Sequence, residues 1–563
     1  MCMNDKIKVF ALGGLDEKGK NLLIIEINES IFVLDCGLKY PHKSIPGVDA
    51  LIPNFDYLKE NREKVKAYII THGHDDKMGG LPYIYREIPA PIVTTKFTAG
   101  IIEMYSQKVG ITNKYNFLLI DGHEFLTISG YRFHFTQVTH SIPFSFACSI
   151  ETSQGNIIYT SDMIIDYNNL SAAFKFSTKN FLHNEGKEAL MLLSDSTNAH
   201  IQGSCSPRYM ITPHVREIFE NSTGRIFAAL YGQNMMNYYE LLTLAEKTGK
   251  TVFFVQKNAT PIMSKLYNDI TCSKIPSKLK FDQIENISRV RDKDVLVLLL
   301  GEGSDLFEKI ISFVNGGFTS KSMDFTSEDT FILNCPAVPT NEVLGTEALD
   351  EVYKTGCKVV NFSRKTLLSM HACEEDIKTL ITFFNPKYYV PISGSFTNMM
   401  TNAKIALNLD KKYNYSNILV PDNGMIINCE NGVCKIDYKN VLPTGDVMID
   451  GKDIGNVGNN VIEERNRLSN DGIVIMGITI SSKKQEIIAG PDVQMRGFVF
   501  LKDSENILHT IIDLFLDQIR VHLTGYTDEV SVEDKIIERV TRYIRRETGK
   551  NPVIVPAILD IDK

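Results

Sequence analysis

The sequence lacks the features of an exported or membrane-bound protein. Its ten cysteines include no Cys-x-x-Cys pair, so neither a disulfide framework nor a zinc knuckle is indicated. No stretch approaches the roughly 18 consecutive apolar residues of a membrane span, and the first residues are polar. We therefore expect a cytoplasmic protein that has no membrane partner.

An excess of positive charge is also missing. The chain has 60 Lys and Arg residues against 68 Asp and Glu residues, a net charge of −8. Proteins that bind nucleic acid regardless of sequence usually carry a broad basic surface, so a nucleic acid would have to be held in a local groove. The charge alone neither supports nor excludes RNA as a ligand.

The chain is long enough for several domains. With 563 residues, 43% of them hydrophobic, it can bury three or four cores. Strands interleaved with helices predict an α/β layered domain over residues 1–205, and helices alternating with apolar strands predict a doubly wound domain over 206–365. Residues 366–430 resemble a return to the first domain, 431–465 a linker rich in Gly and Asp, and 466–563 a compact α+β tail.

The tail can be divided into elements. We expect strands near 472–480, 485–489, 496–501 and 553–559, and helices from about 504 and from Ser531. The residues from Ser531 to Asp534 resemble a capping box. The second helix carries Arg539, Arg542, Arg545 and Arg546 on its polar face. This face is able to meet RNA phosphates, although an ordinary solvated surface is the favoured interpretation.

The most informative motif is His72-Gly73-His74-Asp75-Asp76-Lys77, which follows a strand-like apolar run. His72 and His74 are two residues apart on extended chain, so their side chains point the same way. Imidazoles and a carboxylate at a strand end suit zinc or manganese, which can lower the pKa of bound water to about 7. An H-x-H tripeptide alone is as typical of a solvated loop, so other residues have to decide.

Four further acidic or imidazole residues stand just after strand-like runs, where a site on one edge of a sheet would need them. They are Asp35, His140, Asp162 and Asp195.

Longer motifs accompany these residues: Gly13-Gly14-Leu15-Asp16-Glu17-Lys18-Gly19-Lys20-Asn21, Asp35-Cys36-Gly37-Leu38-Lys39-Tyr40-Pro41, Ser194-Asp195-Ser196-Thr197-Asn198-Ala199, Ala489-Gly490-Pro491-Asp492 and Arg496-Gly497-Phe498-Val499. In order and spacing they resemble the metallo-β-lactamase fold with a β-CASP insertion, and most closely the bacterial ribonuclease J family. The resemblance covers essentially the whole chain. It implies an αββα sandwich, an inserted doubly wound domain and a small α+β C-terminal domain.

The resemblance also implies a site. Ribonuclease J enzymes degrade RNA from a monophosphorylated 5′ end, and also cut internally, with two metal ions. By resemblance His72, His74 and His140 would hold the first metal, Asp162 would bridge, and Asp76 would serve the second. We take Asp76, Asp195 and His371 as the candidate catalytic residues.

Two positions of the second metal site depart from the family. Catalytic members have histidine where this chain has Lys77 and Ser393. An ammonium with a reference pKa of about 10.4 offers only donors, and a serine hydroxyl is a weaker ligand than imidazole. We expect one well-held zinc or manganese ion per chain, a weak or absent second site, and the Lys77 ammonium beside Asp76 and Asp162.

The residues expected to bind substrate depart as well. Leu367, Leu368, Ser369, Met370 and His371 stand where the family has H-x-S-G-H, so only the second histidine remains as a general acid or phosphate contact. A buried structural histidine is the alternative for His371. Glu302 lies where relatives have a Gly-Ser-Gln-Gly phosphate loop and would repel a 5′-phosphate. Asn237 occupies the place of an expected arginine.

Two functions fit these departures. The first is RNA processing and decay with weak metal-dependent 5′→3′ exo- or endoribonuclease activity at most. The second is a non-catalytic scaffold subunit that binds and stabilises a catalytic ribonuclease J paralogue. A small-molecule thioester or lactam hydrolase would leave the insertion and tail unexplained. Expected partners are RNA, such a paralogue, and further copies of the chain joined through the C-terminal domain, which assists oligomerisation in the family.

Overall fold

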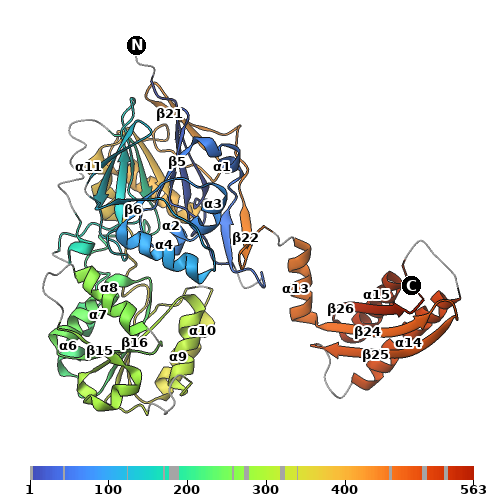
Figure 1. Ribbon diagram of the computed structural model, residues 1–563. Coiled ribbons are helices and arrows are strands. Elements are labelled where there is room, and N and C mark those ends of the chain that lie inside the picture. The colour runs from blue at the N-terminus through green and yellow to red at the C-terminus, as the bar shows by residue number, and fades with distance from the viewer. Residues whose placement is uncertain are drawn as a thin grey trace. The chain divides into compact units, whose positions relative to one another are not determined.

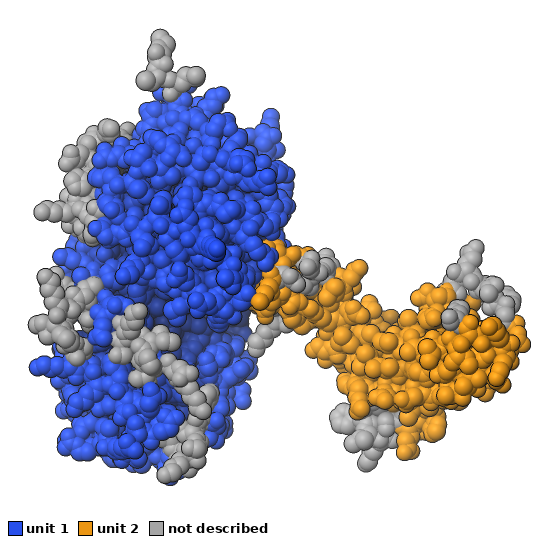
Figure 2. Space-filling view, viewed as in Figure 1, with its two compact units in different colours: residues 1–40, 50–447 blue, residues 41–49, 448–563 orange. Residues whose placement is uncertain are grey.

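The chain divides into two compact units in the computed structural model, residues 1–40 with 50–447 and residues 41–49 with 448–563 (Figure 2). The described residues are 4–41, 45–122, 124–168, 171–176, 189–256, 259–271, 278–317, 324–338, 340–455, 459–497, 504–524 and 531–562.

The first unit contains two large sheets that enclose one core. The eight-stranded sheet has the order β21-β20-β1-β2-β3-β5-β6-β7 and the six-stranded sheet the order β19-β12-β11-β10-β9-β8. Their facing apolar side chains, such as Ile25, Phe135 and Leu193, form a single buried cluster. The strands of the first sheet are β1 (Ile7–Gly13), β2 (Leu22–Ile27), β3 (Ser30–Leu34), β5 (Val65–Ile69), β6 (Ile92–Thr95), β7 (Phe117–Ile120), β20 (Ile426–Glu430) and β21 (Val433–Asp437). Those of the second are β8 (Phe125–Ile128), β9 (Tyr131–Gln137), β10 (Phe146–Ile150), β11 (Asn156–Tyr159), β12 (Ala189–Asp195) and β19 (Tyr388–Ile392).

Helices cover the outer faces of these sheets. Helix α4 (Lys96–Lys108) packs against β6 and β7. On the other side α11 (Glu374–Phe384) and α12 (Phe396–Leu409) bury Ile377 and Ala406 against β12 and β19. The shorter elements of this region are β4 (Ala50–Pro53), α1 (Asp56–Glu60), α2 (Asp75–Met78) and α3 (Leu81–Glu87). These layers form the αββα sandwich that the sequence predicts.

A parallel sheet of six strands lies between β12 and β19 in the chain, in the order β15-β14-β16-β13-β17-β18. Its strands are β13 (Ile226–Tyr231), β14 (Thr251–Phe254), β15 (Lys280–Gln283), β16 (Val295–Gly301), β17 (Thr330–Asn334) and β18 (Lys358–Asn361). Two apolar clusters, one on each face, show that helices cover both sides (Figure 1). One face carries α6 (Thr212–Asn221), α7 (Met235–Lys247) and α8 (Ala259–Thr271), the other α9 (Gly303–Val314) and α10 (Glu342–Lys354). The doubly wound prediction and the α/β class are confirmed.

The second unit is a small α+β domain. Its sheet has the order β25-β24-β26, with β24 (Ile473–Ser481) antiparallel to β25 (Glu486–Arg496) and parallel to β26 (Val553–Asp560). Helices α14 (Ser504–Leu523) and α15 (Val532–Thr548) bury one face of the sheet. Ser531 begins α15 as expected, since its hydroxyl accepts a hydrogen bond from the Asp534 N–H. Among the described residues, no helix combines the length and the apolar composition that crossing a bilayer requires.

The prediction of two separate strands at 485–489 and 496–501 is wrong. A single strand, β25, runs from Glu486 through Arg496, and the predicted residues 498–501 lie outside the described part of the chain. Gly490 and Pro491 lie at a register shift between the Gly477–Asp492 and Thr479–Ala489 pairs, so the missing proline N–H falls in a bulge of this edge strand. Within the predicted linker, β21, β22 (Asp446–Asp450), β23 (Asp453–Ile454) and the start of α13 (Asn459–Asp471) are regular structure.

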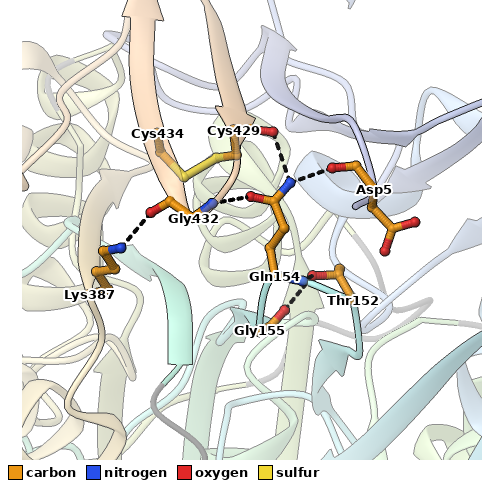
Figure 3. The surroundings of a disulfide bond; sticks show 8 residues. All are labelled: Asp5, Thr152, Gln154, Gly155, Lys387, Cys429, Gly432 and Cys434. Carbon is orange, nitrogen blue, oxygen red and sulfur yellow. Dashed lines mark hydrogen bonds between the residues drawn. A yellow bond between two sulfur atoms is a disulfide. The ribbon is translucent and has the colours of Figure 1, made fainter. Parts of the chain in front are cut away.

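The hairpin of β20 and β21 carries a disulfide that the sequence analysis did not predict. Cys429 and Cys434 are cross-strand partners and are joined through their sulfurs (Figure 3). Asn431 and Gly432 form the two-residue turn with positive φ angles of 51° and 74°, which is the reason for the Asn-Gly sequence. The Gln154 amide accepts from the Gly432 N–H at 2.6 Å and donates to the Cys429 carbonyl at 3.1 Å. The Asn-Gly turn, centred between the cysteines, was the available signal.

We predict that protein purified in air contains a Cys429–Cys434 link. Digestion after alkylation without reductant will give a peptide in which both thiols are protected and which is two hydrogens lighter than the reduced form, measured by mass spectrometry. Cys148 and Cys205, which are free and buried, serve as controls because both are alkylated once the chain is unfolded. Alkylation of Cys429 and Cys434 in the unreduced sample would contradict the prediction.

Candidate metal centre

The candidate site begins where β3 and β5 end side by side. Asp35 follows β3 with a φ of 59°, a left-handed conformation that turns its carboxylate toward the next strand. This carboxylate accepts from the N–H and hydroxyl of Thr71, each at 2.9 Å, and from the Tyr159 hydroxyl at 2.5 Å. Burial raises the pKa of Asp35 to about 6, and the Lys77 ammonium opposes this rise. Asp35 thus holds Thr71, the residue directly before His72, in place.

Three imidazoles converge in front of this strand end. Nε2 of His72 lies 3.0 Å from Nδ1 of His74, and Nε2 of His140 lies 3.1 Å from the same atom. His140 Nδ1 lies 2.8 Å from the Met370 carbonyl and donates to it, which leaves Nε2 free as a ligand. Burial lowers the pKa of all three rings, so they are neutral and present lone pairs.

Asp162 completes the cluster. Its Oδ2 lies 3.8 Å from His72 Nε2, and one donor atom from each of these four residues falls within 4.8 Å of the others. Ligands about 2.0–2.2 Å from a tetrahedral cation are roughly 3.3–3.5 Å apart, close to these separations. Facing imidazole nitrogens share one proton at best, whereas a cation satisfies every lone pair. The donor set therefore fits one divalent metal ion.

Lys77 lies on the other side of Asp162. Its Nζ is 2.9 Å from Asp162 Oδ1, and both side chains are almost fully buried. Burial alone would raise the pKa of Asp162 and lower that of Lys77, but their mutual attraction prevails and moves both pKa values the opposite way. Both groups are ionised. Lys77 Nζ has no hydrogen-bond acceptor in the described part of the chain, so Asp162 balances its charge without saturating its protons.

The remaining ligands expected for a second metal are engaged elsewhere. Asp76 Oδ2 accepts from Asn21 Nδ2 at 3.0 Å, and the Ser393 hydroxyl donates to Asn21 Oδ1 at 3.3 Å. Asp76 is not part of either cluster of metal-competent side chains found among the described residues. The Lys77 ammonium repels cations, and the Asp76 carboxylate and Ser393 hydroxyl are already hydrogen-bonded to Asn21. This side of Asp162 therefore does not fit a second cation. Asn21 was quoted in a sequence motif, but its bridging role was missed.

His371 faces the cluster from the opposite side. Its Nδ1 donates to Asp195 Oδ2 at 2.8 Å, and its ring centre lies 5.5 Å from that of His140. Burial would lower the pKa of His371, but the Asp195 carboxylate, together with Asp162 and Asp76, raises it to about 9. Asp195 is itself fixed by the N–H and hydroxyl of Thr197, at 3.1 and 2.7 Å. His371 is therefore a cation at neutral pH and a poor base.

A cavity of about 260 Å³ opens in front of the imidazoles. Of the five residues expected to bind substrate, four line it: Leu368, Ser369, Met370 and His371. Leu367 does not, because it is buried in the apolar cluster under α6 and α7.

The insertion supplies the opposite wall of the cavity, with Gln233, Asn237 and Glu302 among its residues. Asn237 donates to Glu240 at 2.9 Å and to the Tyr209 carbonyl at 3.2 Å, a buried amide network instead of a projecting arginine. Gln233 was missed by the sequence analysis, since it contacts His74 and Glu302 through its backbone. No residue type signals such a contact.

Comparisons with known proteins agree with this architecture. Residues 15–255 match the family model described as the metallo-beta-lactamase superfamily, and residues 460–561 match that of the ribonuclease J C-terminal domain. "Ribonuclease J 2" of Staphylococcus saprophyticus is 28% identical and "Ribonuclease J2" of Bacillus subtilis 27% identical, each over 99% of both chains. A crystal structure of an Enterococcus faecalis protein of unknown function covers 75% of this chain and 100% of its own, with a TM-score of 0.50 and 15% identity, a likeness in fold alone.

We predict that Asp195→Asn lowers the pKa of His371 from about 9 toward its ordinary value. Removing the carboxylate's charge destabilises the imidazolium, so at pH 8 the wild-type ring is protonated and the variant ring is neutral. Nuclear magnetic resonance of ¹⁵N-labelled histidine rings will measure both titrations, with His371→Gln used for assignment. Exposed His214 is the internal control. Equal His371 titrations in the two proteins would contradict the role given to Asp195.

Proposed function

Because the chain belongs to the ribonuclease J family of the metallo-beta-lactamase superfamily, we propose that it acts in RNA processing and decay, with weak metal-dependent nuclease activity at most. One observation carries this proposal: four ligand side chains converge on one side of Asp162, while the Lys77 ammonium lies on the other. Residues for one metal are present and residues for the second are not. A hydrolase with this site retains part of the family's chemistry.

We propose that His72, His74, His140 and Asp162 hold a single zinc or manganese ion. Such an ion would polarise a phosphate oxygen and lower the pKa of water to about 7. Neutral imidazoles and an ionised carboxylate are the donor types that both metals accept. Asp162, which also faces Lys77, would link the metal side of the site to the ammonium side.

Lys77 takes over part of the electrostatic role of the missing second ion. Its ammonium carries one positive charge instead of two, in a buried position where charge interactions are weakly screened. Because Lys77 is fully buried and does not line the cavity, it would act on a substrate through its charge and not through direct contact. A single point charge stabilises the leaving oxygen less than a metal pair stabilises both oxygens, so the reaction should be slow.

His371 is the candidate proton donor and phosphate contact. With a pKa raised to about 9 it holds its proton at neutral pH, and it lines the cavity beside the metal ligands. Asp195 fixes the ring and Thr197 fixes Asp195, so the donor is preorganised. We assign Asp76 a positioning role through Asn21 and not a ligand role, although the sequence suggested it for catalysis.

The alternative is a non-catalytic scaffold that binds RNA and stabilises a catalytic ribonuclease J paralogue. Departures at Lys77, Ser393, Leu367 and Glu302 favour it, because each removes a metal or phosphate contact of the family while the fold is kept. We propose joining of chains through the C-terminal domain for both functions. For the domains we propose the boundaries 1–205, 206–365, 366–430, 431–465 and 466–563.

We predict one tightly bound divalent ion per chain. After gel filtration in metal-free buffer, mass spectrometry of the elements will give one ion for wild type and for Ser393→His, which keeps Lys77. Lys77→His with Ser393→His removes the ammonium and restores two imidazoles, and will raise the count to two. The single Ser393→His variant is the matched control, and thermal melting checks that each variant folds. Two ions on the wild-type chain would overturn the proposed role of Lys77.

We predict slow manganese-dependent decay of single-stranded RNA, followed by gel electrophoresis. His371→Gln removes the proton donor and should slow decay about 100-fold or more, given the usual contribution of general acids. His214→Gln, an exposed histidine outside the site, should change nothing. Rapid wild-type decay would contradict the weak-nuclease assignment. Complete inactivity, combined with co-purification of a catalytic relative, would favour the scaffold.

A further inference from the structure

The carboxyl ends of β13 and β16 form a crevice at the edge of the cavity. These strands are parallel neighbours, with Tyr231 paired to Gly301. The chain leaves β13 toward α7 on one face of the sheet and leaves β16 toward α9 on the other. In doubly wound sheets, such a reversal is where ligands bind, and the helix N-termini there favour anions.

This crevice already holds a carboxylate. Glu302 follows β16 directly, and its Oε1 accepts from the Gln233 N–H at 2.8 Å, just after β13. The Gly232 N–H also favours the ionised form, and a Cβ added at Gly232 would lie 3.0 Å from Glu302 Oε1, so a larger residue there would push the carboxylate aside. Glu302 is the N-cap residue of α9, but its side chain makes no cap hydrogen bond to that helix. The side chain reaches across the crevice to the other strand end instead.

The crevice is continuous with the metal centre. The Gln233 carbonyl lies 3.4 Å from His74 Nε2, while its N–H binds Glu302. Both residues, together with His371, line the same cavity of about 260 Å³. Asp75 adds a second negative charge that acts on Glu302. An incoming phosphate would therefore find the backbone donors occupied and two carboxylates nearby.

We propose that Glu302 is a specificity residue that fills the backbone anion site with the protein's own carboxylate, so that the cavity accepts RNA with a 5′-hydroxyl end in preference to a 5′-monophosphate. This inference rests on the proposed RNA-related function. The hydrogen bond to Gln233 needs only an acceptor oxygen, which glutamine also supplies. The negative charge of Glu302 is thus not required by the fold and acts on what enters the cavity.

The test compares binding of two RNAs that differ only at the 5′ end. The probes are single-stranded RNAs of about 12 nucleotides with the same sequence and a 3′-fluorescein label. One carries a 5′-hydroxyl and the other a 5′-monophosphate. Anisotropy is read at pH 8, above the Glu302 pKa of about 7, without added divalent metal, and gels confirm that the RNA stays intact. Wild type should bind the 5′-hydroxyl RNA about tenfold more tightly, since the Glu302 carboxylate repels a like-charged 5′-phosphate.

Glu302→Gln should tighten binding of the 5′-monophosphate RNA about tenfold more than that of the 5′-hydroxyl RNA, so that the wild-type preference disappears. Glu308→Gln, an exposed acid on the same helix, is the matched control and should keep the wild-type preference. Equal binding of the two RNAs by wild type, or a preference that survives Glu302→Gln, would overturn the inference and leave RNA binding intact. Failure of wild type to bind either RNA would instead overturn the proposed function, and this inference with it.

Discussion

The buried contact between Lys77 and Asp162 determines what the site can do. Taking both charges out of water costs several kcal/mol per ion, and their attraction repays this only with close geometry, here 2.9 Å. Removing one partner of such a pair usually costs about 3–5 kcal/mol, because the other charge is left buried and alone. Asp162 must therefore remain ionised, which also prepares it to ligate a cation on its His72 side. This ion pair thus excludes a cation on the Lys77 side of Asp162 and keeps the carboxylate ionised for a cation on the His72 side.

The geometry around this pair is set by strand ends in unusual conformations. Asp35, Ser161 and Ser393 follow β3, β11 and β19 with φ angles of 59°, 54° and 60°. Non-glycine residues in this region cost roughly 1–3 kcal/mol each and persist only where the surroundings hold them. Here those surroundings are visible: the Ser161 hydroxyl lies 2.7 Å from that of Thr71, and the Ser393 hydroxyl bonds to Asn21. Backbone strain at these three strand ends is balanced by the polar contacts that their side chains make within the site.

The sequence was most informative where chemistry depends on residue type and spacing. His72 and His74 could be placed together because alternate residues of an extended chain share a side, and His140 and Asp162 because strand ends meet at a sheet edge. Leu367 was misplaced because a motif position fixes the backbone, not the direction of a changed side chain. The Asn-Gly turn was the only local signal for the Cys429–Cys434 link, and the single strand β25 depended on pairing across strands, which local patterns do not encode. Gln233 acts through its backbone, so its identity carried no signal.

Two charged side chains of the site, Lys77 and Glu302, both affect its hold on phosphate. On one side of Asp162 an ammonium stands where the ribonuclease J resemblance implies a second cation, and the Gln233 N–H at the β13–β16 crevice is given to Glu302. Both changes weaken the hold on phosphate, yet the first metal position and the protonated His371 are kept. Lys77 is paired with Asp162, although its Nζ lacks a hydrogen-bond acceptor among the described residues, and Glu302 accepts a hydrogen bond from Gln233, so both replacements are held in place by their surroundings. The site thus combines side chains that fit one cation with an ammonium and a carboxylate at positions that disfavour a second cation and an incoming phosphate.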